Sequence, residues 1–108
     1  MAAVSMTTQQ FNQSITEGGK PVLVEFWAPW CVYCRRISPA MDKIAAQFAD
    51  TLLVGQVNID DEPQLAAKEQ IEVIPTLVLY RDGQALGSIV APESKAKIET
   101  FIQETLNQ

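Results

Sequence analysis

The stretch PVLVEFWAPWCVYCRR, residues 21–36, joins an almost unbroken apolar run to the two cysteines of the chain. Residues 21–27 are typical of a β-strand that is buried on both faces of a sheet. From Cys31 to about Ala49, apolar residues recur with the period of an α-helix. The sequence therefore predicts that the cysteines stand where a buried strand passes into a long helix.

Further elements alternate on both sides of this stretch. They are a helix capped by Thr7 or Thr8 and ended by Gly18-Gly19, a strand at 51–59, a short helix at 63–69, strands at 76–81 and 84–90, and a last helix capped by Ser94. Strands joined by a long helix run parallel through a right-handed crossover, whereas Asp82-Gly83 favours an antiparallel hairpin. We expect one domain over residues 1–108, an α/β sandwich with a central mixed sheet of at least four strands.

The composition narrows the classes of function. The chain has 108 residues, with 8 basic and 13 acidic side chains and a net charge of −5, which argues against nonspecific binding to nucleic acid or to anionic membranes. No apolar run is long enough to span a membrane, and the first residues lack the pattern of a signal peptide, so we expect a cytoplasmic protein. Histidine is absent, which excludes Ser-His and Cys-His catalysis and metal binding through imidazole.

Cys31 and Cys34 are separated by Val32 and Tyr33, and three interpretations of this pair are open. As a structural staple, a bridge over so short a loop would remove unfolded-state entropy worth only about 1.9 kcal/mol. As a zinc site, the pair would supply two of four ligands in a chain without histidine. As a redox pair, it lies at the predicted helix N-terminus, where unpaired N–H groups and a partial positive charge favour a thiolate. We favour the redox interpretation, in which Cys31 attacks a substrate disulfide and Cys34 resolves the mixed disulfide.

The same stretch carries a resemblance to a known family. VLVEFWAPWC, the motif C-R-R-I-S-P with Pro39, VNID, VIPT, DG and the terminal helix together resemble a thioredoxin from about residue 5 to residue 108. The resemblance implies a thioredoxin-like three-layer sandwich, with about five strands in a mixed sheet, about four helices, and a first strand near residues 3–6. It also implies dithiol–disulfide exchange with protein substrates, and re-reduction by a thioredoxin reductase or another dithiol donor. We expect a monomer whose redox group is the Cys31–Cys34 pair, without a cofactor or a metal.

The first departure from the family lies between the cysteines. Val32-Tyr33 stands where the family usually has Gly-Pro, so a backbone N–H that proline lacks is present at Tyr33. If this donor faces the Cys31 sulfur, it stabilises the thiolate and raises the redox potential by roughly 30 to 60 mV. Alternatively, the two residues only reshape the surface around the sulfur.

The second departure concerns a proton acceptor. The resemblance places a buried carboxylate, usually Asp, at Glu25, where it would exchange a proton with Cys34. Gln56 replaces the basic partner often found nearby in the family, and the loss of that charge should raise the pKa of Glu25 further. The plainer interpretation of Glu25 is an outward-facing residue at the wet edge of its strand.

The remaining candidates concern the binding of a partner. The resemblance implies that Pro75 in VIPT is cis and that the Ile74 backbone pairs with an extended substrate segment, although most X-Pro bonds are trans. Trp30 adjoins the first cysteine and is expected to cover part of the docking surface. Ala91 stands where the family commonly has glycine, so its methyl group would narrow the range of partners. The expected substrate-binding residues are Trp30, Val32, Tyr33, Ile74, Pro75 and Ala91.

Two classes of function remain in view. The leading hypothesis is an enzyme, a protein-disulfide reductase whose catalytic residues are Cys31, Cys34 and Glu25. A related alternative keeps this chemistry but runs it as an oxidase or isomerase. The second class is a binding module, whose groove holds a partner while the cysteines seldom turn over; the intact Cys31 and Cys34 argue against it.

Overall fold

The computed structural model describes residues 2–108, and Met1, the first residue of the expected domain, lies outside this range. Its elements, in chain order, are β1 (Val4–Ser5), α1 (Thr8–Glu17), β2 (Val22–Trp27), α2 (Val32–Gln47), β3 (Leu53–Asn58), α3 (Pro63–Lys68), β4 (Thr76–Arg81), β5 (Gln84–Val90) and α4 (Lys95–Leu106). None of the helices in this range combines the length and the apolar composition that crossing a membrane requires.

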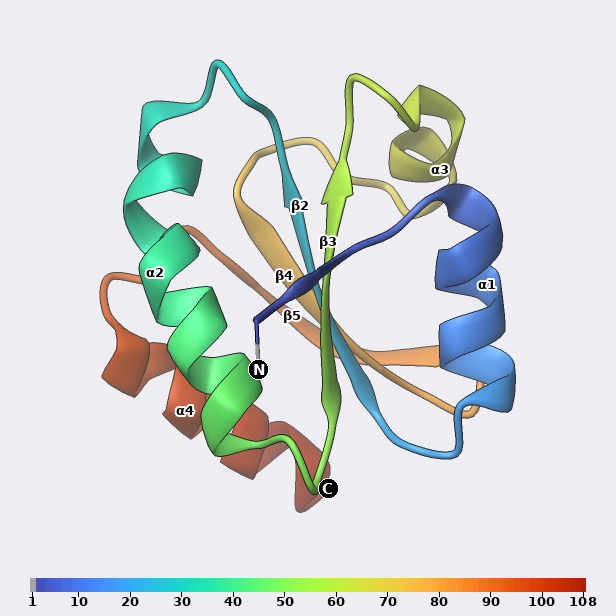
Figure 1. Ribbon diagram of the computed structural model, residues 1–108, viewed down its shortest axis with the longest axis vertical. Helices are drawn as coiled ribbons and strands as arrows, with labels where there is room; N and C mark the ends of the chain where they lie inside the picture. The colour runs from blue at the N-terminus through green and yellow to red at the C-terminus, as the bar shows by residue number, and fades with distance from the viewer. Residues whose placement is uncertain (1) are drawn as a thin grey trace.

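The five strands found within residues 2–108 form one mixed sheet in the order β1-β3-β2-β4-β5. β2 lies in its centre, parallel to β3 and antiparallel to β4. Glu25 pairs with Gln56 across the first of these contacts, and Phe26 pairs with Thr76 across the second. Because β4 begins where β2 ends, the segment before Thr76 lies at the same end of the strands as the loop between β2 and α2 (Figure 1).

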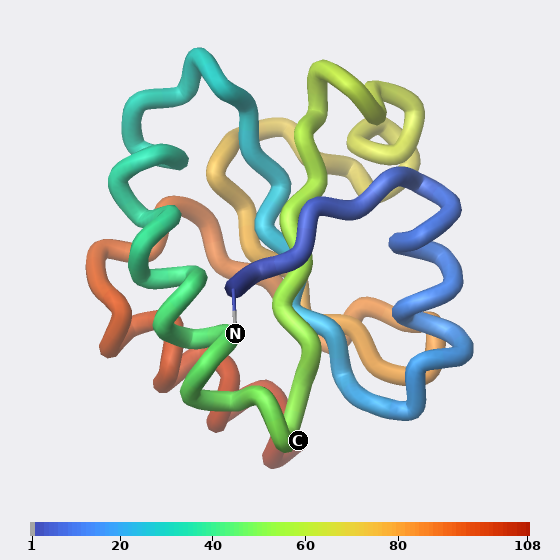
Figure 2. The backbone as a smooth tube through the Cα atoms, in the orientation of Figure 1, coloured from blue at the N-terminus to red at the C-terminus, as the bar shows by residue number. Residues whose placement is uncertain are grey.

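Helices cover both faces of the sheet, with α2 and α4 on one side and α1 and α3 on the other (Figure 1, Figure 2). Side chains alternate between the two faces along β2. Leu23 packs in the core cluster beneath α2 and α4, whereas Val22 and Val24 pack in the cluster beneath α1 and α3. Glu25 is in phase with Leu23, so its carboxyl group points toward α2, the helix that carries Cys34. This three-layer α/β arrangement confirms the expected fold class.

Polar side chains and a tight turn fix where several elements begin. Thr7 caps α1 in a capping box with Gln10, and the Ser94 hydroxyl caps α4. In the turn between β4 and β5, Asp82 has a φ of 54° and Gly83 a φ of 79°, which matches the two positive values of a type I′ hairpin. The predicted caps and the predicted hairpin are confirmed.

The strand predicted at 51–59 is shorter in the structure. The backbone N–H groups of Thr51 and Leu52 both donate to the carbonyl oxygen of Phe48, at 2.8 and 2.9 Å. These bonds close the turn that follows α2, so they hold the two residues away from the sheet. β3 therefore starts only at Leu53, and the buried Leu52 contributes to the core from the turn.

Candidate functional site

The two cysteines form a disulfide across the first turn of α2, with their Cα atoms 5.3 Å apart. Cys31 is the N-cap residue of this helix, and its Sγ accepts a hydrogen bond from the Cys34 N–H at 3.2 Å. Cys31 keeps 9% of its surface exposed, against 1% for Cys34. Cys31 is therefore the cysteine that another molecule can reach, and Cys34 lies behind it.

The local fold places the Cys31 sulfur at the positive end of a helix. The Cys31 N–H donates to the Ala28 carbonyl at 3.1 Å, and the Arg35 N–H donates to the Cys31 carbonyl at 3.2 Å, so the chain turns directly from loop into helix. The unpaired N–H groups of the first turn and the helix dipole favour a negative charge at this point. The position that holds the sulfur in the disulfide thus stabilises a thiolate once the pair is reduced.

The donor to the Cys31 sulfur differs from the one suggested by the sequence. The N–H that lies 3.2 Å from Sγ belongs to Cys34, whereas the hypothesis had assigned this role to Tyr33. An N-cap side chain accepts from the second or third helical residue, and Cys34 is the third residue of α2. This bond would therefore survive a proline at Tyr33, and the altered dipeptide is not its source.

Glu25 is fully buried, and its Oε1 accepts a hydrogen bond from Gln56 Nε2 at 2.8 Å. Its Oε2 has no hydrogen-bond partner among residues 2–108. Burial raises the pKa of Glu25 from its ordinary 4.5 to about 7; the Gln56 hydrogen bond opposes the rise and the charge of Asp42 adds to it. The interpretation of Glu25 as an outward-facing residue is wrong, because none of its surface is exposed.

A cleft of about 390 Å³ opens beside the second cysteine, on the α2 side of the sheet. Its lining residues are Trp27, Cys34, Arg35, Ser38, Pro39, Asp42 and Gln56. Gln56 lines the cleft and also binds Glu25, so one side chain connects the cavity beside Cys34 to the buried carboxyl group.

Exposed apolar side chains gather around Cys31. Trp30, which immediately precedes it, is 66% exposed, and Val32, which follows it, is 57% exposed. The indole Nε1 of Trp30 donates to the Asp60 carboxylate at 3.1 Å, which fixes the ring against the loop after β3. Both residues thus present apolar surface next to Cys31 in the chain.

Two further loops complete this surface. Ile74 packs against the cluster that contains both cysteines, and the Ile74–Pro75 peptide bond is cis, as the resemblance implied. The Ala91 N–H donates to the Pro75 carbonyl at 2.9 Å and joins the loop after β5 to the loop before β4. Val73 and Val90, which are 56% and 52% exposed, were missed by the sequence analysis. We call this surface the docking face, after the role that the resemblance implies for it; it comprises Trp30, Val32, Val73, Ile74, Pro75, Val90 and Ala91.

Tyr33 was expected among the substrate-binding residues, and in the structure it is only partly exposed. Its side chain is half-buried and packs against the core cluster beneath α2 and α4. Its hydroxyl donates to the Pro92 carbonyl at 2.8 Å, across 59 positions of sequence. The side chain therefore joins the start of α2 to the loop between β5 and α4, and supports the docking face from beneath.

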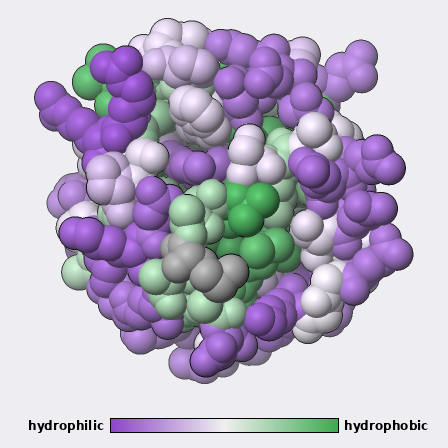
Figure 3. All heavy atoms as spheres, in the orientation of Figure 1, coloured by the Kyte–Doolittle hydropathy of each residue, from purple (hydrophilic) through white to green (hydrophobic). Residues whose placement is uncertain are grey.

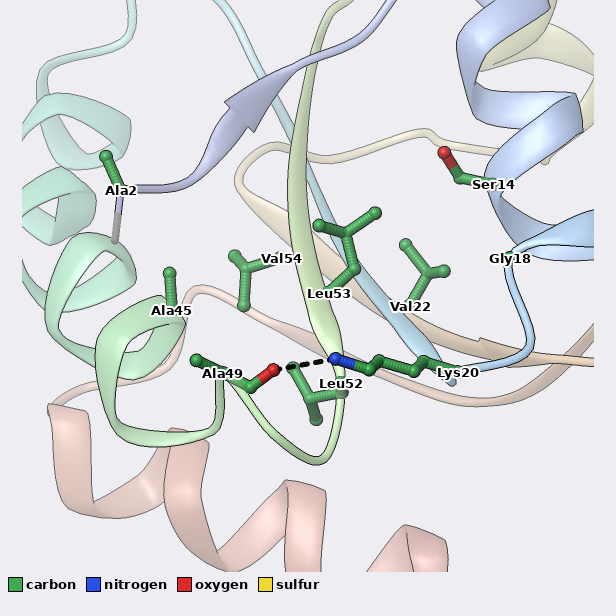
Figure 4. Close-up of a pocket in the computed structure, with 10 residues that line it drawn as sticks. All are labelled: Ala2, Ser14, Gly18, Lys20, Val22, Ala45, Ala49, Leu52, Leu53 and Val54. Atoms are coloured by element: carbon green, nitrogen blue, oxygen red, sulfur yellow. Dashed lines mark hydrogen bonds between the residues drawn. The ribbon is translucent and has the colours of Figure 1, made fainter.

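A second hollow, of about 280 Å³, lies toward the opposite ends of β2 and β3 (Figure 4). Apolar surface gathers near the middle of the face seen in Figure 3, on this side of the molecule. The hollow is lined mainly by apolar residues such as Val22, Leu53 and Val54, and the Lys20 amine at its rim donates to the Ala49 carbonyl at 3.0 Å. The described residues of its lining include no thiol and no carboxylate, so the hollow offers neither a sulfur nucleophile nor an acidic side chain.

Fold and site together define a class of protein: a mixed α/β sheet with a buried carboxyl group on its central strand and a dithiol–disulfide pair at the N-cap of the helix that follows this strand. The family model named Thioredoxin matches residues 2–104, and the chain belongs to the thioredoxin family.

Thioredoxin 1 of Synechococcus elongatus is 38% identical over 96% of this chain and 97% of its own length. Thioredoxin 1 of a Nostoc species is 37% identical over 97% and 98%, and the thioredoxin of Porphyra purpurea is 34% identical over 99% and 100%. Membership supports thiol–disulfide oxidoreductase activity, and it suggests disulfide substrates and a reductase as partners.

Proposed function

We propose that this chain is a protein-disulfide reductase, which passes two electrons from its dithiol to a disulfide in another protein. The observation that carries the proposal is the position of Cys31, whose sulfur caps α2 and which is the more exposed residue of the pair. Cys34 lies one helical turn behind it, within disulfide distance. Attack and resolution can therefore follow each other without a rearrangement of the backbone.

The reaction has two exchange steps. The Cys31 thiolate attacks one sulfur of the substrate disulfide, so a mixed disulfide forms and the first substrate thiolate leaves. Cys34 then loses its proton and attacks the Cys31 sulfur, which releases the second substrate thiolate and closes the Cys31–Cys34 disulfide. The substrate gains two electrons and the dithiol loses them. A thioredoxin reductase or another dithiol donor returns the pair to the reduced state.

Glu25 is the proposed acceptor of the Cys34 proton. Its pKa of about 7 allows it to take up a proton and to release it again near neutral pH. Oε1 is held by Gln56 and Oε2 has no partner in the described chain, so Oε2 is the oxygen available for the proton. The cleft beside Cys34 offers water a path to this part of the site.

The docking face is the proposed site of contact with the protein substrate. Its apolar residues lie around Cys31, the more accessible cysteine, and the proposal assigns to the Ile74 backbone the pairing with an extended segment of the partner. As further parts of this proposal, the protein acts as a monomer in the cytoplasm, with the cysteine pair as its whole redox group.

The experiment combines an insulin-reduction assay with single-cysteine variants. The wild-type protein with a dithiol donor should reduce insulin, Cys31→Ser should be inactive, and Cys34→Ser should accumulate mixed disulfides through Cys31. Turnover by Cys31→Ser at the wild-type rate would end the proposal. Absence of trapped partners with Cys34→Ser would favour a binding module instead.

One observation favours the alternative in which the protein oxidises or isomerises disulfides instead of reducing them. The helix N-terminus stabilises the Cys31 thiolate, and stabilising the reduced form makes a dithiol pair more oxidising. The redox potential, measured by equilibration with glutathione, separates the two directions. A potential near that of reference thioredoxins supports the reductase, whereas a value far above it supports an oxidase or isomerase.

A further inference from the structure

The side chain of Tyr33 crosses from the cysteine motif to a loop on another element. Its ring packs against the core beneath α2 and α4, and its hydroxyl donates to the Pro92 carbonyl at 2.8 Å. Pro92 is itself buried, so the acceptor belongs to a fixed part of the molecule. The contact therefore ties the helix that carries both cysteines to the corner formed by Ala91 and Pro92.

The corner at Ala91 has a backbone conformation that needs support. Ala91 has a φ of +45°, in the left-handed region that a residue with a Cβ atom seldom adopts. Such a conformation persists only where neighbouring groups hold it. One neighbour is the Pro75 carbonyl, which accepts the Ala91 N–H at 2.9 Å. The other is the Tyr33 hydroxyl, which holds the next residue through its carbonyl.

Ala91 belongs to the docking face, between the exposed Val90 and the buried Pro92. Its N–H bond to Pro75 also connects this corner to the cis-proline loop. A shift of the corner would therefore displace two of the three loops that surround the sulfur. A small disulfide needs only the sulfur, whereas a protein needs the whole face.

We infer that Tyr33 is a positioning residue for protein substrates: its hydroxyl holds the Ala91–Pro92 corner in its left-handed form and so keeps the docking face in one arrangement. The inference rests on the proposed function and deepens it. A face that is already ordered binds a partner without the cost of ordering the loop. The hydroxyl therefore acts on the affinity for a protein disulfide and has no part in the exchange of electrons.

The kinetic test uses Tyr33→Phe, which removes the hydroxyl and keeps the ring. Insulin is the protein disulfide and cystamine is the small one. We expect the ratio of the KM for insulin to the KM for cystamine to rise about fivefold, because the loss of one net hydrogen bond changes an affinity by about this factor. The kcat for insulin should not change. Tyr80→Phe is the matched control, because the Tyr80 hydroxyl donates to Glu69 at 2.6 Å on the other side of the sheet. It should leave the ratio as in the wild type.

A rescue separates positioning from general damage. Glycine adopts a positive φ without strain, so Ala91→Gly removes the need for support at the corner. Because the Ala91 methyl group itself belongs to the docking face, the reference is the Ala91→Gly single variant, and the KM ratio of the double variant with Tyr33→Phe should lie within about twofold of it. A ratio that stays raised in the double variant would show that the corner is not the route of the effect.

A second measurement does not depend on turnover. Hydrogen exchange of the Ala91 amide reports the opening of its bond to Pro75, and in Tyr33→Phe we expect it to be about fivefold faster, with no change in Tyr80→Phe. An Ala91 amide that exchanges at the wild-type rate in Tyr33→Phe overturns the inference, as does an unchanged KM ratio. If the wild-type protein reduced neither disulfide, the proposed function would fail, and the exchange rate would still decide whether Tyr33 holds the corner.

Discussion

The Gln56 amide donates to Oε1 of Glu25 at 2.8 Å, from positions that face each other across the parallel strands β2 and β3. The donor is neutral, so no opposite charge in this pair offsets the burial of the carboxylate. Burial consequently dominates and raises the pKa of Glu25 to about 7. The pairing thus leaves on the central strand a buried carboxyl group that can change its protonation state near neutral pH.

Replacing Gln56 by lysine should reverse this balance. An ammonium group at hydrogen-bond distance stabilises the ionised carboxylate, so we expect Gln56→Lys to lower the pKa of Glu25 by about one unit or more. The measurement is an NMR titration of the Glu25 side-chain carboxyl in the wild-type and variant proteins. Gln103→Lys, which adds the same charge at an exposed position on α4, is the control and should leave the midpoint in place. Equal midpoints in all three proteins would contradict the electrostatic account of the pair.

The raised pKa of Glu25 also makes stability depend on pH. The folded state keeps the proton up to about pH 7, whereas the unfolded chain releases it near 4.5. Between these values the folded state binds more protons, so the free energy of unfolding falls as the pH rises. Above pH 7 the ionised, buried carboxylate costs roughly 3 kcal/mol, from the difference between the two pKa values.

Glu25→Gln removes the titrating group and should abolish this dependence. We expect the variant to be more stable than the wild type at pH 8 by up to roughly 3 kcal/mol, and to lose that advantage near pH 4. Urea unfolding of the oxidised proteins at both pH values measures it, with the exposed Glu104→Gln as control. If the difference in free energy of unfolding between the wild type and Glu25→Gln were the same at pH 4 and pH 8, Glu25 would not be a buried acid with a raised pKa.

Trp30 should contribute strongly to the binding of a protein substrate. Its ring is 66% exposed beside Cys31 and is oriented by the Asp60 carboxylate, and aromatic residues of this kind dominate many interfaces. We expect Trp30→Ala to raise the KM for insulin about tenfold, by the loss of one such contact. The control is Val4→Ala, which removes a 43% exposed apolar side chain on β1, away from the docking face. This variant should leave the KM for insulin unchanged. An equal KM in both variants would mean that partners dock elsewhere.

The features that the sequence predicted correctly depend on local patterns. The apolar run at 21–27 indicated the central strand, which the structure places at Val22–Trp27, and the burial of Glu25 follows from its position within that run. The caps at Thr7 and Ser94 and the hairpin at Asp82 are encoded by the residues themselves. In contrast, β1 has only two residues, both exposed, so it carries no pattern, and only the resemblance to thioredoxins indicated it.

The features that escaped prediction depend on contacts between distant segments. The bond from Tyr33 to Pro92 joins residues 59 positions apart and requires the exact path of the loop after β5. Val73 and Val90 are likewise exposed where the segment before β4 lies beside the end of β5, which the Ala91 N–H joins to the Pro75 carbonyl. Periodicity would place such valines in a core, and only their position next to the expected docking residues could have suggested otherwise.

The most direct test of the account is the rate at which iodoacetamide alkylates Cys31 in the reduced protein, measured as a function of pH. The account predicts that Cys31 reacts before Cys34, and that it ionises well below the value of about 8.5 for a free thiol. In urea, where no helix remains to be capped, its midpoint should return to that value. A folded-state midpoint at or above about 8.5, or a Cys31 that the reagent does not reach, would contradict the central claim.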